Sequence, residues 1–192
     1  MKKSTIFIAA LVIIGLWAIS AYNGMVGIQE EATNAAANVQ SAYQRRADLI
    51  PNLVETVKGY ATHEENTLKE VVEARAKATA ITIDPSNCTP EQLQAYQEAQ
   101  GQLGQALGKL LAVSESYPDL KANENFMDLQ KQLEGTENRI NEARNKYNAV
   151  VTDYNSQIRA FPKNIFAKIF GFNVMEKFAA DANAQNAPSV KF

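Results

Sequence analysis

Apolar residues are unevenly distributed along this chain, and their spacing predicts helices throughout. The first feature is an apolar run from Thr5 to Tyr22, and no charged side chain occurs between Lys3 and Glu30. At roughly 1.5 Å per residue, the run of about 18 residues approaches the thickness of the hydrocarbon core of a bilayer. We therefore expect residues 1–26 to form an N-terminal tail and a single membrane-spanning anchor.

A cleaved signal peptide is the alternative interpretation of this run. The tripeptide Ala18-Ile19-Ser20 has the small-x-small form of a signal cleavage site. The anchor is favoured because the run is longer than the usual ~7–15 residues of the apolar part of a signal peptide, and because helical patterning resumes directly behind it. No Cys follows the run, so we do not expect a lipoprotein.

The next segment has the spacing of a helix that buries one face. Between Ile28 and Leu49, apolar or small residues recur in a 4-3 alternation that only Arg46 interrupts with a charge. Pro suits the first turn of a helix and disfavours its interior. We therefore expect Ile50-Pro51 to be the junction between two antiparallel helices.

The second and third patterns lie on either side of a turn-rich loop. The second starts at Val54 and ends near Ile83, before the loop at 84–87, and the third covers residues 93–117. The third has a strong start signal in Thr89-Pro90-Glu91-Gln92, with Thr89 as the expected N-cap and Gln92 at the capping-box position.

The fourth pattern is the longest and completes the predicted architecture. It keeps 4-3 spacing from Phe126 to Phe161, about 36 residues or roughly 54 Å of helix. We expect an all-α protein in which an N-terminal transmembrane helix precedes an up-down-up-down antiparallel bundle of long helices, residues 27–162. Counting directions along the chain then places Phe161 near the bilayer.

Residues 163–192 form an amphipathic C-terminal segment and tail. Apolar pairs alternate with Lys163, Lys168 and Lys177, which predicts two short amphipathic helical turns with a break at Gly171. These turns are expected either to lie on the membrane surface, with contact through residues 163–178, or to cap the open end of the bundle.

Five charged residues occupy seam positions where the pattern requires apolar side chains: Arg46, Glu64, Arg75, Glu137 and Arg144. A lone charge is costly to bury, so we expect these residues either to pair across the helices or to lie on a bundle face that is more hydrated than the pattern suggests. Such a network would fix the alignment of the helices, and the alternative is a polar site for a ligand or a partner's tail. The structural role is favoured because no nucleophile, His or metal-ligand cluster accompanies the charges.

Composition excludes several kinds of chemistry. The chain has one His and one Cys, too few for a di-iron centre, a zinc site or a disulfide framework. Its 19 basic and 21 acidic side chains give no basic face for nucleic acid. His63-Glu64-Glu65-Asn66-Thr67 begins like a zinc-protease motif but has Thr67 in place of the second His. We expect no catalytic residue, no cofactor and no bound metal.

Charge also predicts the orientation in the membrane. Lys2 and Lys3 precede the apolar run, and residues 23–43 contain no Lys or Arg, so the positive-inside rule places the N-terminus in the cytoplasm and the bundle outside it. Cys88 would then be a free thiol or an intermolecular one, and the simpler interpretation is a small loop residue.

Three glycines interrupt the third pattern, at Gly101, Gly104 and Gly108. Because Gly lowers helix stability by up to ~1 kcal/mol relative to Ala, close packing of a neighbouring helix would explain them. That neighbour could belong to the same chain or to another copy.

Several strings resemble the signature of the LemA family. In the first half they are the segments 45–53 and 57–61, His63-Glu64 and Ala74-Arg75. In the second half they include the segment 115–122, Tyr147-Asn148, Tyr154-Asn155 and the end 188–192. The resemblance implies a bacterial, single-pass membrane protein with a helical-bundle domain, and no established catalytic activity. Members have been described with the N-terminus outside the cell, which differs from the orientation that Lys2 and Lys3 predict.

The favoured function is a non-enzymatic scaffold or adaptor in the bacterial inner membrane, which self-associates as a homo-oligomer or presents its bundle to other proteins. Sustained heptads, the glycines and the amphipathic segment all suit association. The alternative is an extracytoplasmic sensor or ligand-binding domain, since helix bundles on membrane anchors bind small molecules between their helices. An enzyme is the least favoured class.

Overall fold

The computed structural model describes residues 3–179, which contain helices and connecting segments but no strand. Residues 1–2, with Lys2 among them, and the segment 180–192 lie outside the described residues. The helices are α1 (Lys3–Lys58), α2 (Glu65–Ala80), α3 (Pro90–Val113), the 3-10 turn η1 (Ser114–Ser116), α4 (Pro118–Lys121), α5 (Glu124–Arg159) and α6 (Lys163–Phe170).

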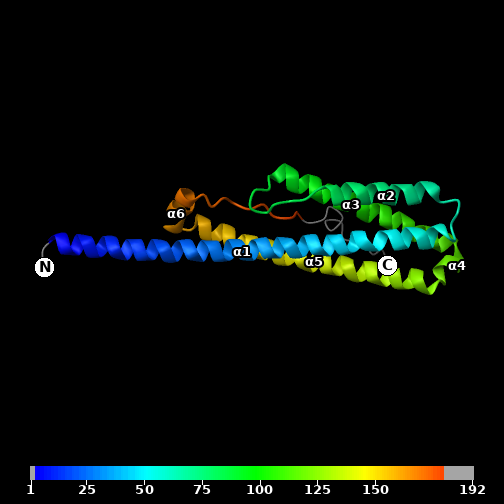
Figure 1. Ribbon diagram of the computed structural model, residues 1–192, viewed down its shortest axis with the longest axis horizontal. Coiled ribbons are helices and arrows are strands. Elements are labelled where there is room, and N and C mark those ends of the chain that lie inside the picture. The colour runs from blue at the N-terminus through cyan, green and yellow to red at the C-terminus, as the bar shows by residue number, and fades with distance from the viewer. Residues whose placement is uncertain (1–2, 180–192) are drawn as a thin grey trace, which may run out of the picture.

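The molecule is a long rod made of two antiparallel helix pairs (Figure 1). α1 and α5 form the longer pair, and α2 and α3 form a shorter pair that lies along the half of α1 remote from its N-terminus. Successive long helices run out, back, out and back, which confirms the predicted all-α fold with an up-down-up-down bundle. With 56 residues, α1 is about 84 Å long.

The predicted helix junction at Pro51 is wrong. α1 continues through Pro51 to Lys58, and Ile50, Leu53 and Val57 keep its apolar face buried beyond the proline. Pro51 lacks the N–H that would bond to the carbonyl of Ala47 in a regular helix. The Arg75 side chain supplies that donor instead, because its Nε donates to the Ala47 oxygen at 2.8 Å.

α1 ends eight residues later than expected, at the Lys58-Gly59 step. The N–H groups of Tyr60 and Ala61 both donate to the Val57 carbonyl, at 3.0 and 2.8 Å, which closes the last turn. α2 therefore begins at Glu65 and is only 16 residues long. A Lys in the last turn followed by Gly is an ordinary helix stop, so the sequence did contain the correct signal.

The third and fourth patterns are confirmed as helices, although α3 ends at Val113 rather than near Tyr117 and α5 ends at Arg159 rather than Phe161. Thr89 caps α3, its side chain accepting from the Gln92 N–H while the Gln92 side chain accepts from the Thr89 N–H. The fourth pattern corresponds to α5, which has 36 residues. The seam positions expected for α3 are buried at Leu93, Tyr96, Gln100, Leu103, Leu107, Leu110 and Ser114.

Two separate apolar cores hold the rod together. The proximal core, nearer the N-terminus of α1, draws on α1 from Met25 to Tyr43, on α5 from Ile140 to Ile158, and on Leu93 and Tyr96 of α3. The distal core draws on α1 from Ile50 to Val57, on α5 from Phe126 to Leu133, and on α2 and α3. Because helices of both pairs contribute to both cores, neither pair would bury its apolar face alone.

The C-terminal segment contains one short helix rather than two. α6 ends at Gly171, which adopts φ +78, and residues 172–179 are extended. Met175 and Phe178 of this extended segment are buried against the bundle, whereas Ile165 and Ile169 of α6 are exposed. The extended half therefore packs on the bundle, whereas α6 keeps apolar side chains exposed that could contact a membrane.

Candidate functional site

A polar layer separates the two apolar cores. Three polar residues on different helices form this layer. Each lies in the gap between the proximal-core and distal-core residues of its own helix: Arg46 on α1, Gln100 on α3 and Glu137 on α5. The gap in each helix is one heptad, so the three residues meet at a single level of the bundle. Arg46 and Gln100 are both buried.

The Arg46 guanidinium joins three helices at this level. Its Nη1 donates to Glu137 Oε2 at 3.0 Å, and its Nη2 donates to both the side-chain oxygen and the backbone carbonyl of Gln100, at 2.8 and 3.1 Å. The Gln100 amide in turn donates to the Ala78 carbonyl on α2 at 3.2 Å. The network therefore reaches all four long helices.

The two charges of this layer differ in their exposure. The Arg46 side chain is 6% exposed and that of Glu137 is 50% exposed, so the buried cation is neutralised by a carboxylate that remains hydrated. The guanidinium lies 5.2 Å from the centre of the Tyr43 ring, and its Nε has no hydrogen-bond partner among the described residues. Only one axial alignment of α1, α3 and α5 satisfies these bonds, which supports the structural role expected for the seam charges.

The other seam charges do not join a single network, contrary to expectation. Arg75 bonds to the Ala47 backbone, as described above. Glu64 lies at the distal end, where its two oxygens accept from Thr67 and Tyr117 at 3.3 and 3.5 Å. Arg144 donates to the Ala179 carbonyl at 2.7 Å, near the opposite end. A backbone carbonyl thus takes the place of the carboxylate predicted to face Arg75, and a backbone carbonyl is one partner of Arg144.

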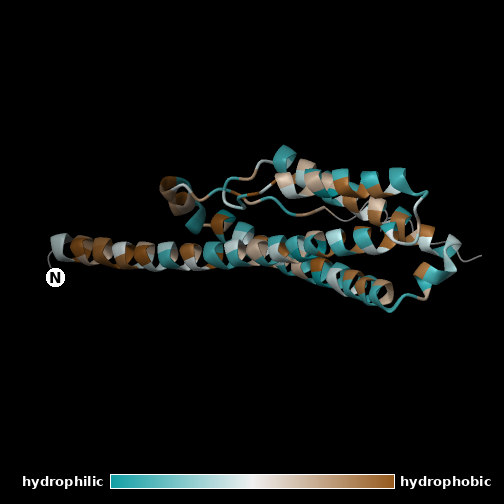
Figure 2. Ribbon diagram, turned by 45° about the vertical axis from the view of Figure 1, so that its right-hand side comes forward, coloured by the Kyte–Doolittle hydropathy of each residue, from teal (hydrophilic) through white to brown (hydrophobic). Residues whose placement is uncertain are grey.

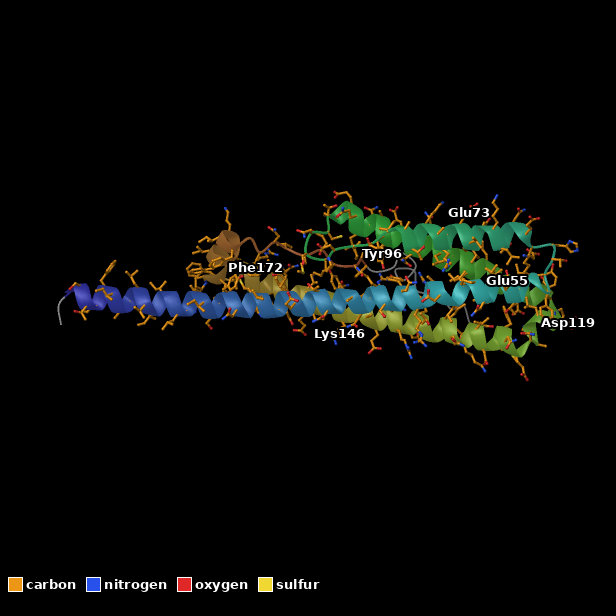
Figure 3. The ribbon with its side chains drawn as sticks, viewed as in Figure 1. Glu55, Glu73, Tyr96, Asp119, Lys146 and Phe172 are labelled. Atoms are coloured by element: carbon orange, nitrogen blue, oxygen red, sulfur yellow. The ribbon has the colours of Figure 1, made fainter. Side chains whose placement is uncertain are left out.

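A cavity of about 320 Å³ lies beside the polar layer, between α1, the end of α2 and α3. Its lining is amide, hydroxyl and apolar, with no acidic or basic side chain: Ala37, Gln40, Ser41, Tyr43, Gln44, Ala47, Ala78, Thr79, Ile81, Thr82, Tyr96 and Gln100. Figure 3 shows Tyr96 between α3 and α1. Burial raises the pKa of the Tyr96 phenol, so this group is neutral at physiological pH.

The residues with reactive side chains are scattered. His63 is exposed in the turn before α2, and burial raises the pKa of the half-buried Cys88 thiol. Within residues 3–179, no three His, Cys, Asp or Glu side chains gather in a way that could hold a metal ion.

The glycines of α3 do not mark a close helix contact within the chain. Among the atoms of residues 3–179, a Cβ built at Gly101 or Gly108 would meet none within 4 Å, and at Gly104 the nearest is Arg46 Nη1, at 3.9 Å. Close packing against a neighbouring helix of the same chain is therefore not the reason for them. Packing against a second copy stays a prediction.

The apolar part of α1 is uncovered, and it is the one described helix long and apolar enough to cross a membrane. Figure 2 shows the apolar residues gathering along this end of α1 and on α6. The large apolar side chains that are exposed on α1 are Ile6, Phe7, Ile8, Leu11, Val12, Ile13, Ile14, Leu16, Trp17, Ile19 and Tyr22. The boundary expected between residues 26 and 27 falls inside α1, which continues across it unbroken.

Aromatic contacts attach α6 to α1 at the end of the apolar run. The rings of Trp17 and Phe166 lie 5.4 Å apart, and the Tyr22 ring contacts Phe170 and Phe172 at 5.0 and 5.7 Å. Figure 3 places Phe172 beside α1, next to α6. This confirms that the chain returns to the level of the apolar run after α5, as counting helix directions predicted.

Asn148 and Asn155 on α5, which entered the sequence analysis only as part of the family resemblance and with no role, hold the extended segment 172–178. Their signal in the sequence is a Tyr-Asn pair repeated after seven residues, at 147–148 and 154–155. A heptad spacing places both asparagines on one face of α5, but only the fold shows what they bind.

Comparison with known proteins gives a consistent picture. The model of the LemA family matches residues 35–192. The chain is 27% identical to Protein LemA of Metamycoplasma hominis over 146 residues, which cover 76% of this chain and 63% of that relative. It is 30% identical to Magnetosome protein MamQ 2 of Paramagnetospirillum magneticum and 29% identical to Magnetosome protein MamQ of Magnetospirillum gryphiswaldense, each over 174 aligned residues covering 82% of this chain and 64% of the relative.

The chain thus spans a little under two thirds of the length of these curated relatives. Together with the uncovered apolar end of α1, they support a membrane-associated helical protein.

Proposed function

The chain belongs to the LemA family, and on that premise we propose that it is a non-enzymatic scaffold or adaptor, which self-associates and presents its bundle to other proteins at a bacterial membrane. The observation that carries this proposal is the continuity of α1. One helix forms both the apolar segment and one of the long helices of the bundle, with no linker between the two parts.

A continuous helix gives the bundle a defined position relative to the bilayer. A flexible linker would let the bundle rotate freely, whereas bending a helix requires breaking backbone hydrogen bonds. The second helix of the long pair, α5, then returns to the membrane and ends in α6. A rod whose two long helices both meet the membrane at the same end suits a protein that presents surfaces rather than one that encloses a substrate.

α6 supports the proposed contact with the membrane surface. It lies level with Trp17 and Tyr22, and amphipathic aromatic rings of this kind favour the interface between lipid and water. Its exposed face carries Ile165, Ile169 and Phe170. In this proposal α6 lies in the interface plane and the extended segment after it returns to the bundle.

The proposed location is the inner membrane, crossed once, with the N-terminus in the cytoplasm and the bundle outside it. The charges of Lys2 and Lys3 support this orientation. A Thr62→Cys variant in a Cys88→Ser background tests it, because Thr62 is exposed in the turn farthest from the apolar run. Labelling by an impermeant maleimide in intact spheroplasts is expected, and labelling only after lysis would reverse the orientation.

A sensor or ligand-binding domain is the second candidate, and the cavity beside Arg46 is the observation that favours it. Native mass spectrometry of the detergent-extracted full chain separates the two. A defined homo-oligomer without added mass supports the scaffold. A monomer that carries a small molecule of constant mass supports the sensor and contradicts self-association.

A further inference from the structure

Four side chains of α5 form a groove that binds the backbone of an extended peptide segment: Tyr147, Asn148, Tyr154 and Asn155. We propose that this groove, occupied here by residues 172–178 of the same chain, also accepts residues 172–178 of a second copy, so that neighbouring copies exchange these segments. The inference rests on the proposed self-association and names the surface through which it occurs.

Two asparagines form the base of the groove. Asn155 Nδ2 donates to the Met175 carbonyl at 2.8 Å, and Asn155 Oδ1 accepts from the Met175 N–H at 2.9 Å. Asn148 makes the same pair of bonds with Phe178, both at 2.9 Å. Each amide therefore satisfies one residue's backbone donor and acceptor together, as a neighbouring strand would.

The spacing of the asparagines fits an extended chain. Asn148 and Asn155 are seven residues apart on a helix, which is about 10.5 Å on one face. Met175 and Phe178 are three residues apart in an extended segment, which spans about 10 Å. Because the two distances agree, both asparagines can bind one uninterrupted extended segment, which runs antiparallel to α5.

Two tyrosines beside the asparagines add bonds of the same kind. The hydroxyl of Tyr154 donates to the Asn173 carbonyl and that of Tyr147 to the Glu176 carbonyl, both at 2.9 Å. All six of these bonds go to backbone groups. They do not distinguish one chain from another, so an identical segment from a neighbour satisfies the groove equally well.

Side-chain pockets select the sequence of the occupant. Met175 and Phe178 are buried. The Phe178 ring lies 5.2 Å from the Tyr147 ring and 6.5 Å from the Tyr96 ring, with the Arg144 guanidinium 5.6 Å from its centre. The occupant is thus an extended segment with apolar side chains three positions apart, and a second copy carries this segment.

The segment's connection to the rest of the chain favours exchange. It begins after Gly171, which has φ +78, and a glycine adopts other backbone angles at low steric cost, so the chain can change direction there. α6 fixes the height of Gly171 relative to Trp17 and Tyr22. Two copies in one bilayer with the same orientation therefore present segment and groove at the same level, and a two-fold axis along the membrane normal allows both exchanges at once.

The test uses two differently tagged full chains, both Cys88→Ser, expressed together in one membrane. One carries Thr152→Cys on α5 and the other Lys177→Cys in the segment, because Lys177 Nζ lies 3.1 Å from Thr152 Oγ1. A short bismaleimide then links a copy to its neighbour only if the segment has been exchanged. A product carrying both tags is the expected result.

In a matched control, Met127→Cys replaces Thr152→Cys, since Met127 is exposed near the opposite end of α5. No product carrying both tags is expected from this pair.

Removing the amides of Asn148 and Asn155 by double substitution to Ala should lower the yield of the two-tag product about ten-fold or more. Phe178→Ala, which leaves α5 unchanged, should lower it as well, with circular dichroism used to confirm that both variants are folded. A two-tag product that is unaffected by these substitutions would overturn the inference. Copies that co-purify without forming it would also overturn the exchange while leaving self-association intact, whereas copies that do not co-purify would contradict both proposals.

Discussion

The Nε of Arg75 donates a 2.8 Å hydrogen bond to the carbonyl of Ala47, the acceptor that Pro51 leaves without its helical donor. A residue of α2 thereby allows α1 to continue through a proline. We expect Arg75→Met to destabilise the protein by about 1–3 kcal/mol, because it leaves a buried carbonyl unpaired. Thermal unfolding followed by circular dichroism measures this loss.

A double-mutant cycle with Pro51→Ala isolates the cause. The Pro51→Ala substitution restores the backbone donor, so Arg75→Met should cost clearly less in that background than in the natural sequence. Equal costs in the two backgrounds would show that Arg75 acts through something other than the Ala47 carbonyl.

Removal of Glu137 should leave the buried Arg46 cation without its counter-charge. We expect Glu137→Ala to destabilise by about 2–5 kcal/mol, toward the lower end because the Glu137 carboxylate is half exposed. Glu137→Gln keeps an acceptor for Arg46 Nη1 and should cost less. An unchanged unfolding midpoint for Glu137→Ala would mean that the polar layer does not depend on this pair.

Burial, with smaller effects of Cys88 and Glu176, raises the pKa of Tyr147 from 10.0 to about 12. The unfolded chain loses this proton first as the pH rises, so the stabilisation from Tyr147 is complete below pH ~10 and is lost between pH ~10 and ~12. The temperature of the unfolding midpoint should therefore be lower at about pH 11.5 than at about pH 9. Tyr147→Phe should reduce this fall without abolishing it, since burial also raises the pKa values of Tyr96 and Tyr154. An identical fall in Tyr147→Phe would contradict the assignment.

How much the sequence could predict depends on where each element finds its partners. The start of α3 was predictable because Thr89 and Gln92 satisfy each other within one turn. The path of α1 was not, because Pro51 is tolerated through Arg75, which lies far along the chain on another helix. That buried Arg46 would need a partner on another helix followed from the cost of burying a lone charge, but the identity of that partner, Glu137, did not. The backbone partners of Arg75 and Arg144 could not be predicted, because a pattern of side chains does not indicate which backbone carbonyls lie nearby.

α6 should lie at the level of the lipid head groups. A spin label at Ile169, which is 68% exposed, is expected to be accessible to oxygen dissolved in the bilayer and protected from a water-soluble nickel reagent. A label at Met127 on the distal half of α5 should show the reverse. Equal accessibility of both labels to the nickel reagent would place α6 in water and remove the proposed membrane contact.

The most direct test of the account measures whether the bundle is joined to the membrane segment by one unbroken helix. Spin labels at Ala9 and Asn38, both exposed on α1, are about 29 positions apart, which is about eight turns and roughly 44 Å. Double electron–electron resonance on the full chain in lipid nanodiscs should give one narrow distribution near that distance. A broad distribution, or a main distance well below it, would show a hinge between the apolar segment and the bundle and would contradict the rigid scaffold.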